Sequence, residues 1–570
     1  MIEEKSLVID PRRQRVALVC IGAVMALLLA RTAYLHLIEK DFLQGQGDAR
    51  HQRTVEVPAH RGMILDREGE PMAASAPVDS VWANPEELLT ARAQWPQLDR
   101  LLGVNVARAL AGRETREFIY LRRHIDPALA EQVLALGVPG VALQREYRRF
   151  YPLGEVGSHI VGFTDVDNAG QEGAELAFDE TLRGAPGQRR VIRDRLGRVV
   201  EDVEYVRQPK PGGSQRLSID RRVQYLAYRE LKAAVQRNRA RAGSVVVMDV
   251  ESGEVLALVN QPSFNPNNRD ELRSDHYRNR ALTDIFEPGS TVKPFTVAAA
   301  LDSHAVSGGV VINTHPGFMR VAGRTVKDLH DYGLVDLTTL IKKSSNVGSA
   351  KLSLQTEPEA LWNVFAGLGF GGAPSSGFPG ETTGQLPHFS GWRDVHRVTL
   401  SYGYGLSVTP LQLAQAYAIL ANGGRRLAPT FVPRQLGESA VGDQVISAMT
   451  ATRVRAMMES VVKEGGTAVQ AAIPGYRVAG KTGTVRKAGA GGYIEDQYLS
   501  VFAGLAPASN PRLAMVVMID EPRGEEYYGG AVAAPVFASV MAGALRLLDI
   551  APDDVSTKGV QLAMAGEHRR

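Results

Sequence analysis

An unbroken apolar run near the N-terminus constrains this chain more than any other feature of its sequence. The run extends from Val16 to Ala30 and continues through Arg31 and His36 to Ile38. A membrane-spanning helix needs about 20 mostly apolar residues, and an arginine near its end can extend its guanidinium to the lipid headgroups. We therefore expect residues 16–38 to form a transmembrane anchor.

The residues before this run predict the orientation of the anchor. Arg12, Arg13 and Arg15 precede it, and the positive-inside rule places such a segment in the cytoplasm. Residues 1–15 are then a cytoplasmic N-terminus, and the chain beyond the anchor lies across the membrane. A cleaved signal peptide is the alternative, but no good small-x-small cleavage site follows the run. A buried core helix fits less well, because the run is apolar on every face.

Composition excludes several classes of function. The chain has 570 residues, 44% of them hydrophobic and 22% charged, which is typical of a globular protein with more than one domain. A net charge of +3 without a long basic run does not indicate nucleic-acid binding. Cys20 is the single cysteine, so the chain has no internal disulfide and no cysteine-based metal site.

Two regions of different character follow the anchor. Residues 40–215 have dense turn signals with short strand-like pieces between them, and the sequence from Lys210 to Gly213 is typical of a linker. Residues 216–550 have longer periodic segments, in which Asp220 can cap a helix. The last 20 residues, 551–570, are polar and predict a disordered tail.

The second region predicts one antiparallel sheet covered by helices near its two ends, with a helical lobe between them. Glu251, Ser252 and Gly253 supply a hairpin turn between its first two strands. The predicted strands are 244–248, 254–259, 476–485, 498–505 and 513–520, and the last predicted helix is 531–548.

Ser290 and Lys293 form the first motif that carries chemistry. An alanine-rich stretch follows them, so Ser290 lies at a helix start and Lys293 lies one turn away on the same face. A serine hydroxyl is a weak nucleophile that needs an adjacent base. A lysine can serve if burial or a neighbouring cation lowers its pKa. By itself, this spacing favours an ordinary capped helix over a catalytic pair.

Two further motifs lie later in the chain. Ser344 and Asn346, two residues apart, can project a proton-relaying hydroxyl and a hydrogen-bonding amide from one turn. By itself, this motif favours a polar helix cap. Lys481, Thr482, Gly483 and Thr484 lie in a strand pattern and offer a fixed positive charge and hydroxyls for a carboxylate. A lysine- and threonine-rich edge strand would also fit that sequence.

The three motifs together are far more specific than each alone. Ser-x-x-Lys, Ser-x-Asn and Lys-Thr-Gly occur here in this order and with wide spacing, as in β-lactamases and penicillin-binding proteins. The sequence resembles the penicillin-binding protein family from the anchor onward. Residues 60–69 and 170–179 look like the pedestal of the class B branch, and residues 147–165, 345–348 and 527–537 are similar to its division-specific members.

The resemblance implies a fold and a location. It implies an α/β (α+β) architecture with a transmembrane helix, an extended β-rich pedestal with a dimerisation-like fold, and a transpeptidase domain with a five-stranded antiparallel sheet. It also implies a single-pass protein of the bacterial inner membrane, with a periplasmic catalytic domain at the division septum. Partners would be other membrane proteins of the division machinery, including a polytopic glycan polymerase.

The resemblance also implies a mechanism. Ser290 would attack the carbonyl between two D-alanines of a peptidoglycan stem peptide, Lys293 would take its proton, and Ser344 would pass it on, with Lys481 shaping the local field. Asn346 would bind the substrate backbone, and Thr482, Gly483 and Thr484 would line the substrate site. β-Lactams would acylate the same serine. No metal and no organic cofactor is implied.

Two aromatic segments have open roles. Tyr527 and Tyr528 could form a wall beside the site or could be ordinary packing. The sequence from Tyr402 to Gly405 could line the floor of the cleft, but a plain turn is favoured.

Other functions remain as alternatives. An elongation-type transpeptidase usually has aspartate where this chain has Asn346. A β-lactamase would need a Glu-x-x-Leu-Asn base, which residues 359–363 match only imperfectly, and a bifunctional synthase would need an additional glycosyltransferase domain. A β-lactam receptor would need an effector motif such as His-Glu-x-x-His, which the sequence lacks. A division scaffold could coexist with enzymatic activity.

Overall fold

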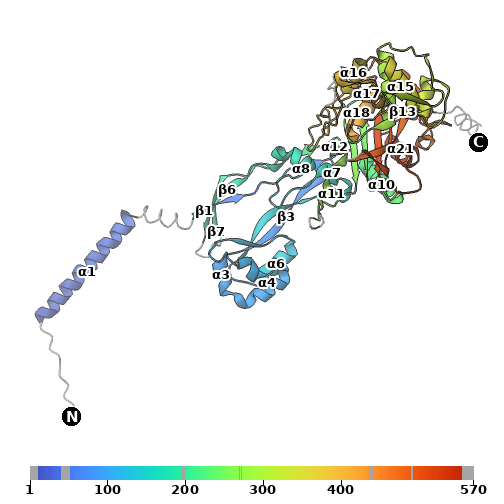
Figure 1. Ribbon diagram of the computed structural model, residues 1–570. Coiled ribbons are helices and arrows are strands. Elements are labelled where there is room, and N and C mark those ends of the chain that lie inside the picture. Colours follow the sequence, from blue (N-terminus) through green and yellow to red (C-terminus); the bar gives the residue numbers. More distant parts are fainter. Residues whose placement is uncertain are drawn as a thin grey trace, which may run out of the picture. The chain divides into compact units, whose positions relative to one another are not determined.

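The computed structural model describes residues 11–39, 52–193, 199–268, 270, 272–434, 442–489 and 492–554. Predictions for residues 1–10 and 555–570 fall outside this range. Contacts between Cα atoms divide the chain into two compact units (Figure 1). The first comprises residues 1–60, 77–147 and 184–211, and the second comprises residues 61–76, 148–183 and 212–570.

The predicted N-terminal anchor is one long helix. Helix α1 (Pro11–Leu37) has exposed side chains along its length, and an 18-residue stretch within residues 12–37 has a mean hydropathy of 2.2. Residues 529–547 are also apolar enough to span a membrane, but half of that segment is buried within the fold. The expectation of an N-terminal apolar helix is therefore confirmed, and the second segment is a core element.

The first unit contains a three-stranded antiparallel sheet and a helical cluster. The sheet has the order β1 (Gln52–Val57), β6 (Gly187–Arg193) and β7 (Val199–Arg207). The cluster packs Leu88, Leu98 and Leu102 under strand β4. The elements around it are β3 (Pro71–Ala83), α3 (Pro85–Thr90), α4 (Trp95–Leu102), α5 (Val106–Leu110), β4 (Ile119–Ile125), α6 (Pro127–Ala135) and β5 (Val141–Phe150). The sequence predicted short strands in this region and missed these helices.

A buried ion-pair network stabilises the early segments of the second unit. Arg61 donates to Glu175 Oε2 and Asp179 Oδ1 at 2.7 Å each, and Arg149 donates to Glu175 Oε1 at 2.6 Å. Arg61 and Glu175 are almost completely buried. The surrounding elements are β2 (Ile64–Leu65), α7 (Ser158–Val161), α8 (Gly173–Ala177), α9 (Asp179–Arg183) and β8 (Gln215–Arg216).

A five-stranded antiparallel sheet forms the centre of the second unit. Its order is β10 (Val255–Gln261), β9 (Ala242–Asp249), β19 (Leu513–Asp520), β18 (Gly492–Ala506) and β17 (Ala479–Gly489). Helices α10 (Arg221–Arg237) and α21 (Ala534–Leu547) pack together on one face, and the buried helix α18 (Pro410–Ala421) packs on the other (Figure 1). Asp220 caps α10 by accepting from Arg222 N at 2.9 Å, as the sequence predicted.

In the sequence, the predicted helical lobe lies between strands β10 and β17 of the sheet. In it, α13 contacts each of α15, α16 and α19, and Phe295 of α13 and Phe365 of α16 belong to the buried core. Its elements are α11 (Ser274–Tyr277), α12 (Arg280–Thr283), α13 (Lys293–Asp302), β11 (Val311–Asn313), β12 (Phe318–Val321), β13 (Arg324–Lys327), β14 (Leu334–Asp336), α14 (Leu337–Lys343), α15 (Asn346–Gln355), α16 (Pro358–Gly367), α17 (Asp394–Ser401), β15 (Arg425–Arg426), β16 (Asp443–Gln444) and α19 (Ala448–Met458).

The predicted fold class is confirmed, with small shifts at element ends. Strand β18 begins at Gly492, six residues before the predicted Tyr498, because its first part forms an exposed hairpin with β17 beyond the sheet. The predicted helix 531–548 is divided into α20 (Gly529–Val532) and α21, and Pro535 lies in the first turn of α21.

Candidate active site

Ser290 lies in a short 3₁₀ turn, Gly289–Val292, which leads directly into α13. The turn is fixed from two sides, because Gly289 N donates to Gly403 O at 3.0 Å and Tyr417 donates to Thr291 O at 2.8 Å. Ser290 is half-buried and lines a cavity of about 620 Å³. Among the described residues, none forms a hydrogen bond with its hydroxyl, which is therefore available to a ligand.

Lys293 follows one turn later and is completely buried. Its Nζ donates to Ser344 O at 2.5 Å, to Asn346 Oδ1 at 2.7 Å and to Ser344 Oγ at 3.1 Å. Burial lowers the pKa of Lys293 well below its usual value, and the positive charge of Lys481 lowers it further, whereas Asp328 opposes the shift. Lys293 therefore has the burial and the neighbouring cation that a neutral lysine base requires.

The Ser-x-Asn motif surrounds the junction of two helices. Ser344 ends α14 in the left-handed conformation, with φ 59° and ψ 40°. Ser345 caps α15 by accepting from Gly348 N at 2.8 Å, and Asn346 is the first residue of that helix. This turn directs the side chains of Ser344 and Asn346 to the same Lys293 Nζ, whereas their spacing alone predicted only that both project from one turn.

Asp328 holds this turn, although the sequence analysis did not identify it. Its carboxylate accepts from Asn346 N at 2.5 Å, from Ser345 Oγ at 2.6 Å and from Val347 N at 3.0 Å. The adjacent Lys327 carbonyl accepts from Asn346 Nδ2 at 3.0 Å. No local pattern marks an aspartate just after a β-strand as the cap of a later helix, so the sequence offered no signal for it.

Lys481, on β17, completes a chain of polar groups. Its Nζ donates to Ser344 Oγ at 2.9 Å, so the Ser344 hydroxyl lies between Lys293 and Lys481. Burial lowers the pKa of Lys481 to about 7. A hydroxyl that contacts two amines can accept a proton from one side and donate one to the other.

After Lys481, the residues of β17 face alternately the cavity and the turn that carries Ser290. Thr482 and Thr484 line the cavity, and Thr482 Oγ1 shares a 2.9 Å hydrogen bond with Thr467 Oγ1. Gly483 lies outside the cavity lining, against the turn that carries Ser290. A Cβ at Gly483 would come within 3.0 Å of Thr291 Cγ2 and 3.1 Å of Pro288 O. Glycine thus permits the strand and the nucleophile turn to pack closely.

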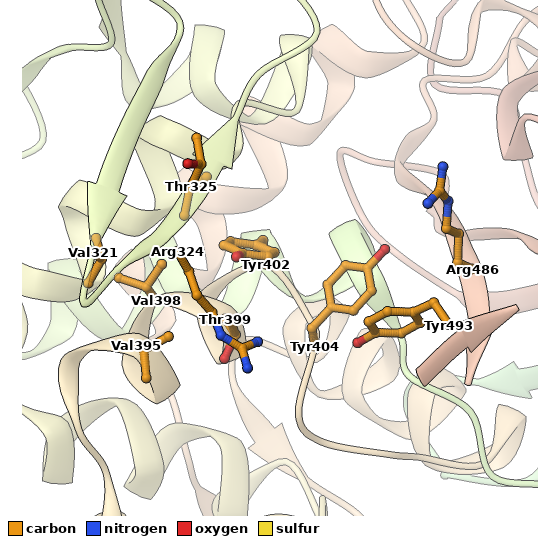
Figure 2. A pocket seen from close by; sticks show the side chains of 11 residues that line it. Val321, Arg324, Thr325, Val395, Val398, Thr399, Tyr402, Tyr404, Arg486 and Tyr493 are labelled. Atoms are coloured by element: carbon orange, nitrogen blue, oxygen red, sulfur yellow. The ribbon is translucent and has the colours of Figure 1, made fainter. Parts of the chain in front are cut away.

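The sequence left two roles open for Tyr527 and Tyr528, a wall beside the site and ordinary packing, and each tyrosine has one of them. Tyr527 is stacked between Tyr498, at 4.2 Å between ring centroids, and Tyr528, at 4.5 Å. Tyr528 is half-exposed and lines the cavity, whereas Tyr527 lies behind it. Tyr402 to Gly405 form a turn, as favoured, and both tyrosines of that turn line a second cavity (Figure 2).

Comparison with known proteins places this geometry in a family. A model described as the penicillin binding protein transpeptidase domain matches residues 243–542, and one described as the penicillin-binding protein dimerisation domain matches residues 56–217. The chain belongs to the penicillin-binding protein family. The expected enzyme class, a transpeptidase that is a serine acyltransferase, is confirmed with it.

Several full-length relatives are similar over nearly the whole chain. Peptidoglycan D,D-transpeptidase FtsI of Escherichia coli strain K12 is 44% identical over 94% of this chain and 92% of its own length. Probable peptidoglycan D,D-transpeptidase PenA of Neisseria meningitidis serogroup A is 41% identical, with the same shares covered. The expected relationship to FtsI-type proteins is confirmed.

Solved structures are similar as well. The transpeptidase domain of Burkholderia pseudomallei penicillin-binding protein 3 is 42% identical, with a TM-score of 0.55 over 59% of this chain and 97% of its own length. Penicillin-binding protein 3 of Mycobacterium tuberculosis in complex with aztreonam is 27% identical, with a TM-score of 0.68 over 87% of this chain and 98% of its own length.

Proposed function

We propose that this chain cross-links peptidoglycan stem peptides at the division septum through an acyl-enzyme on Ser290. The observation that carries the proposal is the environment of Lys293. Its amine is buried one turn from Ser290, and it contacts Ser344 and Asn346 of the second motif. Three motifs that are far apart in the sequence thus meet at one cavity, which Ser290 lines with a free hydroxyl.

In the first half-reaction, Ser290 Oγ attacks the carbonyl between two D-alanines. Lys293, neutral before attack, takes the hydroxyl proton. When the C–N bond breaks, the proton passes through Ser344 Oγ, which Lys481 also contacts, to the departing D-alanine amine. An ester now joins the remaining peptide to Ser290. An amine of a neighbouring stem peptide then attacks this ester, forms the new amide and returns the proton to Ser290.

Other groups at the cavity bind and orient the substrate. Thr482 and Thr484 hold the terminal carboxylate, and the backbone amides of Ser290 and Thr484 stabilise the oxyanion, at about 3–4 kcal/mol per donor. Asn346 has one Nδ2 hydrogen left for a substrate carbonyl, because the other is donated to Lys327 O. Tyr528 supplies an aromatic wall. A β-lactam would place its ring carbonyl where the scissile amide lies, and no metal or organic cofactor takes part.

The test of this function is the intact mass of the purified chain after incubation with benzylpenicillin. The wild type should gain the mass of one penicilloyl group, and Ser290→Ala should gain none while unfolding at nearly the same temperature. Ser390→Ala is a matched control, because Ser390 is exposed and lies outside the cavity lining. A penicilloyl adduct on Ser290→Ala would remove Ser290 from the nucleophile role.

The proposal includes a location in the bacterial inner membrane. Arg12, Arg13 and Arg15, at the start of α1, support a cytoplasmic N-terminus and a periplasmic catalytic domain. A reporter that functions only outside the cytoplasm should be active when fused after Leu548. Activity of a cytoplasmic reporter at that position would reverse the orientation.

Partners in the division machinery are the last part of the proposal. Gly22 and Ala26 lie one turn apart on α1, and such a pair allows another membrane helix to approach closely. We expect α1 to bind spans of other division proteins, including a polytopic glycan polymerase. Replacing residues 16–38 with an unrelated span should preserve β-lactam acylation and abolish septal function. Full division activity after the replacement would contradict this role.

A further inference from the structure

A separate cavity of about 330 Å³ lies between the end of α19 and the start of β17. Its lining includes the pair of Glu459 and Arg477, in which the guanidinium donates to both carboxylate oxygens, at 2.7 and 3.0 Å. Glu459 is buried, so this pair is a fixed part of the lining. None of the lining residues also lines the catalytic cleft. We call this space the Glu459 cavity.

Two charged side chains of the lining remain available to a ligand. Lys463 is exposed, and its ammonium lies 3.9 Å from Glu459 Oε2, which already accepts from Arg477. The carboxylate of Asp554 makes no hydrogen bond or ion pair with any residue that the structure describes, and it acts electrostatically on Arg477. The cavity therefore offers one ammonium and one carboxylate to a molecule that brings the opposite charges.

The rest of the lining is largely apolar. Val462, Ile473 and Val478 are buried and supply hydrocarbon surface. Tyr476 adds its ring, because its hydroxyl is already donated to Ile550 O at 2.7 Å. The space holds roughly ten water molecules, which is enough for an amino acid with a branched apolar side chain. One ammonium, one carboxylate and an apolar wall match the carboxylate, the ammonium and the side chain of such a zwitterion.

Both walls of the Glu459 cavity continue into the catalytic cleft. Val478 directly precedes β17, on which Thr482 lines the cleft. Lys463 lies on a loop whose Gly465 and Thr467 also line the cleft. Thr467 Oγ1 shares its 2.9 Å hydrogen bond with Thr482 Oγ1, so the two walls are joined at the cleft. A ligand that holds Lys463 therefore restrains the loop at the cleft as well.

We propose that the Glu459 cavity binds a free amino acid with an apolar side chain, and that its occupancy speeds acylation of Ser290. The carboxylate of the amino acid pairs with Lys463, its ammonium pairs with Asp554, and its side chain packs on the apolar wall. Binding holds the loop in the arrangement that joins Thr467 to Thr482, so the cleft needs less ordering when a β-lactam or a stem peptide enters. The amino acid is not consumed, and the site goes beyond the proposed transpeptidation.

Three probes, each used as the racemate, test the site: leucine, leucinamide, which lacks the carboxylate, and N-acetylleucine, which lacks the ammonium. The measurement is equilibrium binding to the purified full chain, with and without excess benzylpenicillin to fill the cleft. The wild type should bind leucine about tenfold more tightly than either analogue, the size of one charge-assisted hydrogen bond. Lys463→Gln should remove the preference over leucinamide, and Asp554→Asn should remove the preference over N-acetylleucine.

The second measurement is the second-order rate of acylation by benzylpenicillin. Saturating leucine should raise the wild-type rate about fivefold, at the lower end of the coupling found between two sites. Lys463→Gln/Asp554→Asn should react at the wild-type rate without leucine and should show no rise with it. Glu464→Gln is the matched control, because Glu464 is exposed next to Lys463 but lies outside the lining, and it should keep both responses.

Equal affinity of the wild type for the three probes, or leucine binding that survives the double substitution, would overturn the site. Leucine binding that disappears once benzylpenicillin fills the cleft would place leucine in the cleft and would also overturn it. An acylation rate that bound leucine leaves unchanged would disprove the coupling. Failure of wild-type acylation by benzylpenicillin would instead overturn the proposed function, while binding measured without benzylpenicillin would still decide on the cavity.

Discussion

Lys293 is a buried amine whose environment favours its neutral form. Burial and the Lys481 charge both lower its pKa, which favours the neutral amine that can act as a base. Arginine at this position would keep the charge and the approximate reach but would not lose its proton. Lys293→Arg should therefore fold and still bind penicillin, but be acylated slower by orders of magnitude.

The measurement is the second-order acylation rate of purified Lys293→Arg across pH. The acylation rate of the wild type should fall as the pH is lowered and Lys293 becomes protonated. The residual rate of the variant should not show this fall, which we call the acidic limb of the profile. A variant rate within about tenfold of the wild type, or about 1.4 kcal/mol of barrier, would show that Lys293 acts only as a positive charge.

Asp328 has two effects on the site: it accepts hydrogen bonds from the Ser-x-Asn turn, and its negative charge raises the pKa of Lys293. Asp328→Asn keeps one acceptor oxygen but removes the negative charge, which raises the pKa of Lys293 in the wild type. We expect the acidic limb of the acylation profile to move to lower pH, and the rate at its plateau to fall by about tenfold, because the turn loosens.

Asp336→Asn is the control for this change. Asp336 caps α14 by accepting from Thr339 N at 2.7 Å, and it is not among the groups that shift the pKa of Lys293. Asp336→Asn should leave the pH dependence of the acylation rate unchanged. An unchanged acidic limb in Asp328→Asn would mean that Asp328 has a structural role alone.

At the scale of elements, the turn that carries Ser290 packs against the turn formed by residues 402–405. Gly403 has φ +87°, and a Cβ there would lie 2.0 Å from Gly289 O. Gly403→Ala must therefore displace the turn that carries Ser290. We expect it to lower the acylation rate by more than tenfold and to lower the unfolding temperature.

Gly405→Ala isolates the cause of this loss. Gly405 has φ +80°, so both alanine variants bear the same backbone cost, about 1–2 kcal/mol. A Cβ at Gly405 would meet only Thr399 Oγ1, at 3.7 Å. If the two variants acylated benzylpenicillin at the same rate, contact between the turns would not position Ser290.

Local sequence patterns predicted much of this architecture, and their limits are physical. The strands of the central sheet and the cap of α10 follow from periodicity and turn chemistry within a few residues. The approach of Ser344 and Asn346 to Lys293 was expected from the combination of motifs. The contacts of Asp328 and the second cavity were not predicted, because they join segments whose positions depend on tertiary packing. The helices α3 to α6 were missed because they are short and are separated by turn signals.

At the scale of the whole molecule, the second unit depends on a buried charge network. Arg61 donates to Glu175 and Asp179, and Arg149 shares Glu175. Arg61→Ala would leave a buried carboxylate without one partner and should destabilise this unit by about 3–5 kcal/mol. The measurement is thermal or denaturant unfolding of the purified chain.

Arg183→Ala is the matched control for Arg61. Its guanidinium also pairs with Asp179, at 2.5 Å, but the Arg183 side chain is 57% exposed. Exposed pairs contribute about 0–1 kcal/mol, so this variant should unfold close to the wild type. Equal unfolding of the two variants would show that the buried network adds little stability.

The strand order of the central sheet has a consequence for synthesis of the chain. Strand β19 lies between β9 and β18, yet it is the last strand in the part of the sequence that the structure describes. Ribosomes make the nucleophile turn long before this strand, and the sheet stays divided until β19 arrives. A polypeptide that ends before Leu513 would contain every residue of the three motifs and still lack the strand that holds the two halves of the sheet together. The order of synthesis thus delays the chemistry until nearly the whole polypeptide exists.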